Sequence, residues 1–337
     1  MKNDLIGESA EFLAVLDKVS LLAPIERPVL ITGERGTGKE LIAQRLHYLS
    51  SRWEKPMITM NCGALSEGVI DSELFGHESG AFTGSKGRHR GRFERAESGS
   101  LFLDELANAP LNVQEKLLRV IEYGEYERVG GSQTLKANVR MICATNENLL
   151  KLAEQQKFRA DLLDRLAFDV IHLPPLRARH EDILPLAEHY AIRMSREMQL
   201  SCFPGFSDNA LRQLFSYHWP GNIRELKNVV ERAVCQHQSE QEPIPGLILN
   251  PFESIWADDK TSQQSPEPEN VDNGEKEQPT LPVNLKDWLD SQEQQLIHQA
   301  LQQAKYNQRN AAELLGLSYH QLRGLIRKYQ ILINKPG

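Results

Sequence analysis

The segment that most constrains this chain is Gly-Glu-Arg-Gly-Thr-Gly-Lys-Glu at residues 33–40, which carries the G-x-x-x-x-G-K pattern of a phosphate-binding loop. An apolar run at residues 28–32 precedes it, and a helix-forming run at residues 40–49 follows it. Glycines let several backbone N–H groups turn toward one phosphate, and the start of a helix adds a positive dipole. A glycine-rich turn without a ligand is the alternative, but strand, loop, lysine and helix all agree with a nucleoside-triphosphate site. The residues expected to contact ATP here are Gly33, Glu34, Arg35, Gly36, Thr37, Gly38, Lys39 and Glu40.

The residue after Lys39 is Glu40, although phosphate loops usually carry Ser or Thr there for Mg²⁺. Another acid must therefore hold the metal. Residues 100–105 form an apolar run that ends in Asp104 and Glu105, which is typical of a buried parallel strand with a site at its carboxyl end. We expect Asp104 to hold Mg²⁺, directly or through water, and Glu105 to orient and deprotonate the attacking water. A strand followed by a helix-capping aspartate is the alternative, which the upstream phosphate loop disfavours.

Composition excludes several classes of protein. The net charge of −7 over 337 residues means that any contact with nucleic acid must come from a local basic patch. No apolar run approaches the roughly 20 residues needed to span a bilayer, and the acidic N-terminal segment is not a signal peptide. Four cysteines have neither metal-binding spacing nor a disulfide pattern, which predicts a reducing cytoplasm. They are Cys62, Cys143, Cys202 and Cys235.

Strands and helices alternate in the first half of the chain, which predicts an α/β domain with a parallel five-stranded sheet covered on both faces. The predicted strands are residues 29–32, 57–61, 101–104, 139–145 and 168–173, with a helix at 112–122 among the connections. The pattern then becomes helical, at residues 183–196, 208–215 and 222–235. The predicted division is a nucleotide-binding subdomain at 1–175, a helical lid at 176–252, a flexible acidic linker at 253–283 and a helical DNA-binding domain at 284–332.

The linker and the helix after it are predicted from composition and periodicity. Residues 257–280 contain seven acids against two lysines and almost nothing apolar, as disordered linkers do. A helix is then predicted at about 286–303, where apolar residues recur at helical spacing. We expect these residues to pair two copies of the chain, and they are Leu289, Leu296, Ile297, Ala300 and Leu301.

Residues 310–329 have the spacing of a helix-turn-helix. Ala312 is small where two helices would cross, Gly316 lies at the turn, Leu322 packs the second helix back, and Ser318 is a good N-cap for that helix. A plain three-helix bundle is the alternative, but a local basic excess in an acidic protein favours DNA. The residues expected on DNA are Ser318, Tyr319, His320, Gln321, Arg323, Arg327 and Lys328.

One further motif is carried by Gly-Ala-Phe-Thr-Gly-Ser at residues 80–85, a glycine-flanked loop with an aromatic residue suited to a partner contact. It resembles the GAFTGA loop of bacterial enhancer-binding proteins, the AAA+ activators of sigma-54 RNA polymerase. With the phosphate loop, the Asp-Glu strand and the DNA-binding segment, the resemblance covers nearly the whole chain. It implies that Phe82 and Thr83 touch sigma-54 at the loop tip. Ser85 replaces the usual final alanine, and Glu40 is common in this family. The implied sigma-54 contacts are Gly80, Ala81, Phe82, Thr83, Gly84 and Ser85.

The resemblance also implies roles for polar residues elsewhere. Asn61 resembles a switch asparagine that couples the catalytic glutamate to the loop, and Thr145 with Asn146 resembles sensor I. Arg159 and Arg165 resemble arginine fingers that reach a neighbour's nucleotide, which implies a ring, in this family a hexamer. Arg224, within Trp-Pro-Gly-Asn-Ile-Arg, resembles sensor II. Turn-capping by Asn61 and solvated or paired arginines are the ordinary alternatives.

The resemblance therefore predicts an ATP-hydrolysing transcription activator that binds upstream DNA and remodels sigma-54 polymerase. The AAA+ segment begins within the first few residues, so no sensory domain is expected before it, and control is expected from a repressor acting in trans. Trp53 is a candidate docking residue, with a buried core tryptophan as the alternative. Two rival functions are another AAA+ machine, such as a replication initiator, and a non-enzymatic DNA-binding regulator. The loop at 80–85 opposes the first, and the intact Lys39, Asp104 and Glu105 oppose the second.

Overall fold

The chain forms two units, Met1–Ala257 and Asp258–Gly337, and each is described by itself. The computed structural model describes residues 5–81, 87–237, 239–251, 293–294, 296–301, 304 and 307–329. The predicted linker at residues 253–283 lies outside these ranges, and the finer predicted boundaries at 175, 252 and 283 stay predictions. Within the described ranges, no helix is both long enough and apolar enough to cross a membrane.

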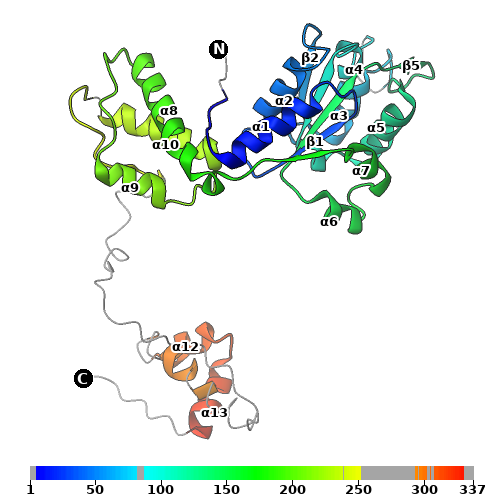
Figure 1. The fold of residues 1–337 in the computed structure, drawn as a ribbon. Helices are drawn as coiled ribbons and strands as arrows, with labels where there is room; N and C mark the ends of the chain where they lie inside the picture. Colours follow the sequence, from blue (N-terminus) through cyan, green and yellow to red (C-terminus); the bar gives the residue numbers. More distant parts are fainter. Residues whose placement is uncertain are drawn as a thin grey trace, which may run out of the picture. The chain divides into compact units, whose positions relative to one another are not determined.

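A five-stranded parallel sheet forms the centre of the first unit (Figure 1). Its strand order is β2 (Met57–Asn61), β3 (Ser100–Asp104), β6 (Arg140–Thr145), β1 (Val29–Thr32) and β7 (Val170–His172). These are the five predicted strands. The last is shorter than expected, because only residues 170–172 of the predicted segment 168–173 pair with β1. Since all strands are parallel, the segments that follow β1 and β3 reach the same edge of the sheet.

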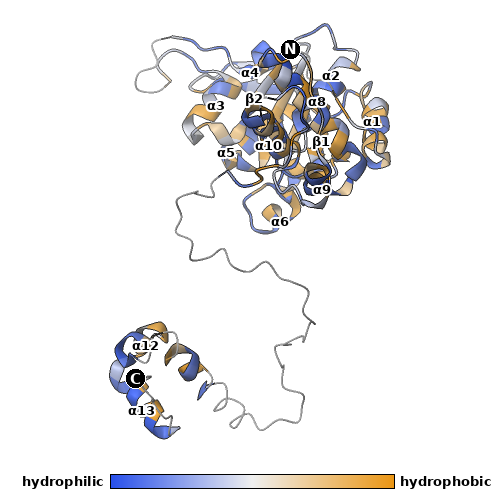
Figure 2. Cartoon of the chain, turned by 90° about the vertical axis from the view of Figure 1, so that its left-hand side faces the viewer, coloured by the Kyte–Doolittle hydropathy of each residue, from blue (hydrophilic) through white to orange (hydrophobic). Residues whose placement is uncertain are grey.

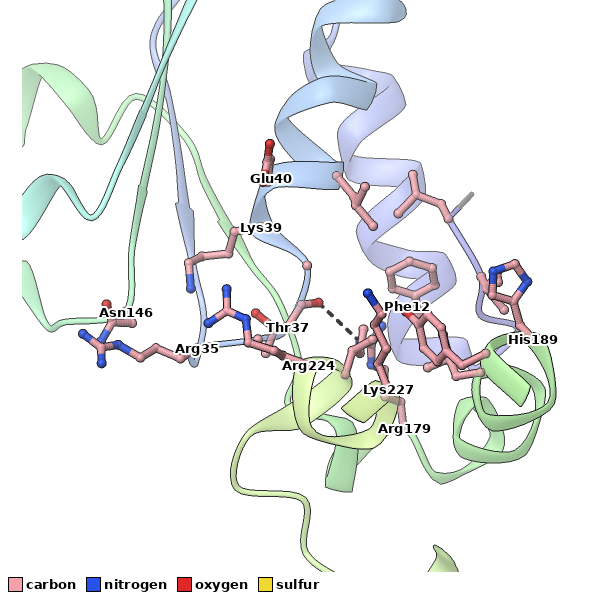
Figure 3. A pocket seen from close by; sticks show the side chains of 18 of the residues that line it. Phe12, Arg35, Thr37, Lys39, Glu40, Asn146, Arg179, His189, Arg224 and Lys227 are labelled. Atoms are coloured by element: carbon pink, nitrogen blue, oxygen red, sulfur yellow. Dashed lines mark hydrogen bonds between the residues drawn. The ribbon is translucent and has the colours of Figure 1, made fainter. Parts of the chain in front are cut away.

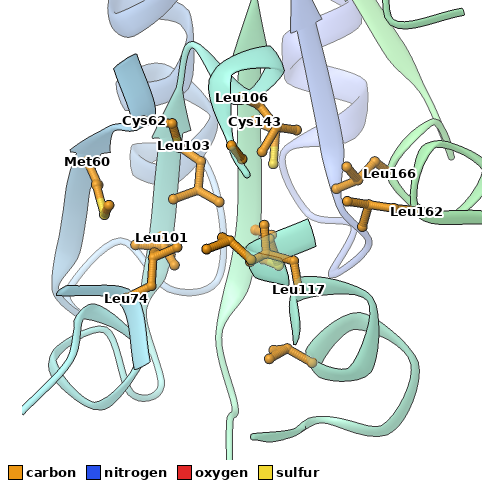
Figure 4. Close-up of a cluster of buried hydrophobic side chains, with 14 of the residues drawn as sticks. Met60, Cys62, Leu74, Leu101, Leu103, Leu106, Leu117, Cys143, Leu162 and Leu166 are labelled. Carbon is orange, nitrogen blue, oxygen red and sulfur yellow. The ribbon is translucent and has the colours of Figure 1, made fainter. Parts of the chain in front are cut away.

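Helices cover both faces of the sheet because successive strand residues point to opposite sides. Along β1, Val29 and Ile31 belong to one core and Leu30 belongs to the other. Figure 4 shows part of the second core, where Leu103 of β3 and Cys143 of β6 lie together. The helices of the first core are α1 (Ala10–Leu22) and α2 (Lys39–Tyr48); those of the second are α3 (Glu67–Phe75), α4 (Arg92–Arg95), α5 (Leu111–Tyr123), α6 (Leu149–Glu154) and α7 (Ala160–Leu166).

A short antiparallel hairpin between α5 and β6 was not predicted. Its strands are β4 (Glu125–Glu127) and β5 (Thr134–Lys136). Strands of this length are too short for alternation of polar and apolar residues to be detected in a sequence. Two single 3₁₀ turns also follow the strands that end at the site, η1 (Cys62–Ala64) after β2 and η2 (Leu106–Asn108) after β3.

The lid is a separate helical layer with a core of its own. Trp219 lies at its centre, fully buried, and its ring N–H donates to the carbonyl of Leu214 at 2.9 Å. The three predicted lid helices are confirmed, each ending one or two residues later than expected. The lid elements are η3 (Leu176–Ala178), η4 (His180–Asp182), α8 (Ile183–Glu197), α9 (Asp208–Ser216) and α10 (Asn222–His237).

The second unit contains the predicted helix pair, α12 (Gln308–Leu314) and α13 (Tyr319–Lys328), joined through Gly316 at φ +66°. Ala312 and Leu322 are buried as expected, and Figure 2 shows hydrophobic and hydrophilic residues on both helices. The predicted helix at 286–303 is described only at 293–294 and 296–301, which are helical.

The residues expected to pair two copies through that helix are mostly used within the unit itself. Ile297, Ala300 and Leu301 are buried in the same core as α12 and α13. Leu296 is 55% exposed, and Leu289 lies outside the described residues. The apolar periodicity therefore reflects internal packing at three of these positions, so Leu296 is the described member left for a contact with a second copy.

Candidate nucleotide site and its surrounding surfaces

The phosphate loop joins β1 to α2 with the geometry that its glycines predict. Gly36 and Gly38 have φ values of +78° and +98°, and α2 begins directly at Lys39. The Lys39 Nζ donates to the carbonyls of Gly33 and Glu34, at 2.9 Å each. Burial lowers the pKa of Lys39, and the nearby carboxylate of Asp104 counteracts that effect. The loop thus presents an ammonium group and the N-terminal end of a helix to the same space.

A cavity of about 410 Å³ lies against this loop (Figure 3). Ligand pockets span about 300–1,000 Å³, so its size suits a nucleoside triphosphate. The predicted site residues that line it are Arg35, Gly36, Thr37, Gly38, Lys39, Glu40, Asp104, Glu105, Asn146 and Arg224. The remaining lining comes from the N-terminal segment and the lid, namely Leu5, Ile6, Phe12, Leu41, Arg179, Leu186, His189, Tyr190, Arg193, Ile223 and Lys227.

The two predicted acids stand where β3 ends. Asp104 pairs in register with Asn61 of β2, and its Oδ1 accepts the backbone N–H of Glu105 at 2.9 Å. Glu105 has a φ of +52°, which turns its side chain out of the strand direction. Its Oε2 accepts from Asn108 Nδ2 at 3.4 Å, and a Cβ on Gly63 would lie only 2.2 Å from that oxygen. The absence of a side chain at position 63 therefore makes room for the Glu105 carboxylate.

The lid is hydrogen-bonded directly to the phosphate loop. Arg177 donates to both carboxylate oxygens of Glu34, at 2.5 and 2.9 Å, and Asn222 Nδ2 donates to Glu34 at 3.1 Å and to the Arg35 carbonyl at 3.0 Å. Gly36 fits because a Cβ there would approach the Gly221 carbonyl to 2.3 Å. The hydrogen bond from Arg177 lowers the pKa of Glu34 to about 2. Its charged contacts are therefore present above its ordinary pKa of 4.5 and weaken only as the pH falls toward about 2.

Several of these residues were not found by sequence reasoning. Asn222 is buried at φ +52° and also accepts the backbone N–H of Leu176 at 2.8 Å, so one side chain joins two lid segments to the phosphate loop. Arg177 acts from η3, 143 residues away from Glu34. The local signal for Asn222 was its place in Trp-Pro-Gly-Asn beside Arg224. No local signal marks Arg177, because its partner is distant in sequence.

The loop at residues 80–85 is described only at Gly80 and Ala81; Phe82, Thr83, Gly84 and Ser85 lie outside the described residues. Its stem is closed by His77 and His89, whose backbones exchange hydrogen bonds of 3.2 and 2.9 Å. On both sides of the loop the stem is tied to the β4–β5 connection. Arg128, which follows β4, forms ion pairs with Glu78 before the loop at 2.7 Å and with Glu94 after it at 2.8 Å.

The helix α13 begins with a capping box. Ser318 Oγ accepts the backbone N–H of Gln321, and Gln321 Oε1 accepts the backbone N–H of Ser318 at 2.9 Å. These two predicted DNA contacts therefore have a structural role that the sequence interpretation gave only to Ser318. His320, Arg323 and Arg327 are exposed on the same helix, and Tyr319 is half-buried. Lys328 is exposed as well, with its Nζ 3.6 Å from a carboxylate oxygen of Glu293.

Comparison with known proteins places this geometry in a family. Three family profiles match: the sigma-54 interaction domain at residues 5–172, an AAA+ ATPase lid domain at 177–246, and a bacterial regulatory protein of the Fis family at 289–329. The Psp operon transcriptional activator of Escherichia coli (strain K12) is 58% identical over 330 residues, which are 98% of this chain and 99% of that protein. The chain belongs to the sigma-54-dependent AAA+ activators.

Other members share the central part. The Nif-specific regulatory protein of Azospirillum brasilense is 50% identical over 234 residues, 69% of this chain and 37% of that protein. NtrX from Brucella abortus, solved in complex with ATP and with ADP, superposes with a TM-score of 0.68 at 28% identity, covering 97% of this chain and 70% of NtrX. The activator is thus an ATP-binding AAA+ ATPase with a Fis-type DNA-binding domain, and its partners are sigma-54 RNA polymerase and DNA. The family match argues against both rival functions.

Six residues predicted for the nucleotide site of this activator do not line its cavity. Two of them are Gly33 and Glu34, whose carbonyls accept from Lys39. The other four are as follows. Asn61 accepts the Gly63 N–H at 2.7 Å, and Thr145 is buried with its hydroxyl accepting the Glu147 N–H at 3.0 Å. Arg159 and Arg165, at α7, are held by ion pairs of 2.7 Å within their own subunit. Their partners are Asp161 for Arg159 and Glu122 for Arg165. Their roles stay predictions.

Proposed function

We propose that this activator uses ATP hydrolysis in the cavity to move the loop at residues 80–85 against sigma-54, so that polymerase opens the promoter. The observation that carries the proposal is the convergence of four residues on one cavity from the start of α2, the end of β3 and the lid. They are Lys39, Asp104, Glu105 and Arg224. Lys39 and Arg224 stabilise charge on the phosphates, and Glu105 takes the proton of the attacking water. Positioning and electrostatic stabilisation supply most of the catalysis in phosphoryl transfer.

The residues of the site also fit a magnesium ion. Mg²⁺ is usually bound by one or two carboxylates together with substrate phosphates and several waters. Asp104 lines the cavity beside the phosphate loop, whereas no group of three or more His, Cys, Asp or Glu within the described ranges is arranged to hold a metal alone. We therefore assign the ion to Asp104, directly or through water, with phosphate oxygens as its other ligands. Bound there, the ion neutralises charge on the phosphates.

A route made of strand pairing, a close contact and continuous chain joins the acids to the loop. Asn61 lies beside Asp104 in the paired strands and accepts the N–H of Gly63, which packs against Glu105. From Gly63 the chain runs through η1 and α3 to the loop stem at His77. If Glu105 moves when the γ-phosphate is lost, the neighbouring turn η1 with Gly63 would be the first part of this route to move. This arrangement supports the proposed role of Asn61 as the switch between hydrolysis and loop movement.

We also propose that the working form is a ring, in this family a hexamer. Arg159 and Arg165 lie outside the lining of their own subunit's cavity, which is what a residue acting on a neighbour's nucleotide requires. A guanidinium reaching the γ-phosphate from a second subunit would complete the charge stabilisation there. An ATPase rate per subunit that does not depend on protein concentration would contradict this proposal.

The target and the control of the activator are proposed from its full-length relative. We propose that it activates the phage-shock operon and is held inactive by phage shock protein A. Trp53 is 56% exposed, so the alternative of a buried core tryptophan is wrong. It lies between α2 and β2, a few residues after Tyr48 and Leu49 at the end of α2, and all three side chains are exposed. We propose that they offer apolar surface to a protein partner.

The repressor contact leads to a prediction for Trp53→Ala. Purified phage shock protein A should inhibit the ATPase of the wild-type chain, and the variant should need at least about tenfold more repressor, as loss of an interface tryptophan implies. Its ATPase rate without repressor should be unchanged. Phe215→Ala, at a 43% exposed residue of lid helix α9, is the matched control and should be inhibited like wild type. Equal inhibition of all three proteins would refute the docking role.

The proposed function as a whole is tested by promoter opening. Sigma-54 polymerase on a promoter template should form open complexes with this activator and ATP, and none with a non-hydrolysable ATP analogue. The readout is permanganate footprinting of unpaired thymines. Opening with the analogue would mean that binding suffices and hydrolysis is not the driving step. Measurable ATPase without opening on a competent template would contradict the coupling.

A further inference from the structure

The cavity of this activator has two chemically different ends. Lys39, Asp104 and Glu105 form a charged end suited to phosphates. At the other end, apolar and aromatic side chains lie among the polar or charged Arg179, His189 and Lys227. This lining comes from two parts of the chain that are far apart in sequence. The N-terminal segment supplies Leu5, Ile6 and Phe12, and the lid supplies Leu186, Tyr190 and Ile223. If the phosphates occupy the charged end, the nucleoside lies at the second end. The lining of that end is complete only while the N-terminal segment and the lid stay together.

Asp182 joins the two parts. It is fully buried at the end of η4, and its carboxylate accepts three hydrogen bonds from the N-terminal segment across more than 170 residues. Oδ1 accepts the backbone N–H groups of Glu8 at 2.6 Å and Ser9 at 2.8 Å, and Oδ2 accepts the Ser9 hydroxyl at 2.8 Å. Ser9 is also the N-cap of α1, so the same contact fixes where α1 starts. Hydrogen bonds to a buried charged group are among the stronger ones in proteins.

The close approach of the segment leaves no room for a side chain at Gly7. A Cβ there would lie 2.8 Å from Asp182 Oδ2 and 2.4 Å from the ring of Phe12. Phe12 itself lines the cavity. The backbone at Gly7 therefore packs closely between the Asp182 carboxylate and the ring of Phe12.

Arg179 extends the contact to the phosphate loop. It is buried, with Nη1 3.9 Å from Asp182 Oδ2 and its guanidinium 4.8 Å above the ring of Phe12. Its Nη2 donates to the Thr37 carbonyl at 3.5 Å, which Figure 3 shows as a dashed line. Burial lowers the pKa of Arg179, and the carboxylate of Asp182 counteracts it. One lid turn thus contacts the N-terminal segment, the nucleoside end and the phosphate loop.

We propose that Asp182, with Ser9 and Arg179, is a latch that positions the nucleoside end of the cavity, so that affinity for the purine nucleoside depends on the lid holding residues 5–9. This inference rests on ATP binding in the cavity described above. The latch touches neither the attacking water nor the scissile bond. It acts on binding of the nucleoside, and catalysis at saturating ATP is left to Lys39 and Glu105.

The test uses the full chain and the variants Asp182→Asn and Ser9→Ala. Asparagine keeps the shape of the side chain but replaces one accepting oxygen with an NH₂ group. That group cannot accept the hydrogen bond that the carboxylate receives from the N-terminal segment. We expect the Kd for ADP and the KM for ATP to rise about tenfold or more for Asp182→Asn, and about threefold for Ser9→Ala, from the strengths of charged and single hydrogen bonds. The kcat at saturating ATP should stay within about twofold of wild type, because the catalytic groups are untouched.

Inorganic tripolyphosphate separates positioning from a general loss of structure. It has no nucleoside, so its inhibition constant should be the same for wild type and both variants. Asp71→Asn is the matched control, because Asp71 accepts from Lys116 through both oxygens at 2.8 Å and does not line the cavity. It should change none of these constants.

Three results would overturn the latch. They are a tripolyphosphate constant that weakens as much as the ADP constant, a fall in kcat with unchanged KM, and wild-type ADP affinity in Ser9→Ala, which remains informative if Asp182→Asn fails to fold. Failure of the wild-type chain to bind ADP would instead contradict ATP binding at the cavity itself.

Discussion

Replacing Glu105 with glutamine is expected to lower the ATPase kcat by about 10²–10⁴-fold while ATP stays bound, because general-base catalysis contributes about that much. Glutamine keeps the shape of the side chain and its contact with Asn108, but it cannot accept a proton from water. The structure supports a catalytic rather than a packing role, since the carboxylate faces the cavity and is accommodated by a glycine at position 63.

The measurement is steady-state phosphate release together with equilibrium binding of a fluorescent ATP analogue. Glu115→Gln is the matched control, since Glu115 is exposed on α5 and does not line the cavity; it should keep the wild-type rate. A Glu105→Gln variant that retains more than about a tenth of the wild-type kcat would assign the base elsewhere. Loss of ATP binding in the variant would mean that Glu105 holds the nucleotide rather than activating water.

Replacing Thr83 with alanine is expected to reduce open-complex formation to background while ATPase activity stays within about twofold of wild type. The residue belongs to the loop implied to contact sigma-54, and it is not expected to touch the nucleotide. The change removes the hydroxyl and the methyl group that the partner surface would engage, without adding bulk. Open complexes are counted by footprinting and ATPase by phosphate release, on the same protein preparation.

Ser85→Ala is the control in the same loop, because it also removes a side-chain hydroxyl group and gives the GAFTGA sequence usual in the family. It should keep both promoter opening and ATPase activity. Parallel loss of both activities in Thr83→Ala would show that the threonine is needed for the fold of the loop or the ring. Loss of opening in both variants would mean that the loop tolerates no change at all.

The parts of the fold that were predicted from sequence are those with local signals. The five strands of the sheet and the lid helices follow from apolar runs and helical spacing, and the phosphate loop follows from its glycines and Lys39. The β4–β5 hairpin was missed because three-residue strands have no measurable period. At the site, Lys39, Asp104 and Glu105 were predicted to meet because parallel strands end at one edge.

The contacts that join distant segments could not be predicted in this way. Asp182 is hydrogen-bonded to Ser9, and Asn222 to Glu34, because the lid packs back on the first subdomain. The local sequence around each residue does not indicate which distant residue it will contact. The apolar helix before the helix-turn-helix shows the opposite error. Its periodicity was real, but at Ile297, Ala300 and Leu301 it was used by the internal core.

The grip of Arg177 and Asn222 on the phosphate loop has a consequence for how this activator can be divided. A fragment that ends near residue 175 would keep the whole G-x-x-x-x-G-K sequence and every strand of the sheet. It would nevertheless lose the donors to Glu34 and to the Arg35 carbonyl, and with them the groups that shape the loop. We therefore expect the motif-bearing segment alone to bind phosphate more weakly than the segment with its lid. Recombination, truncation or domain grafting would preserve full phosphate binding only when the lid is carried along.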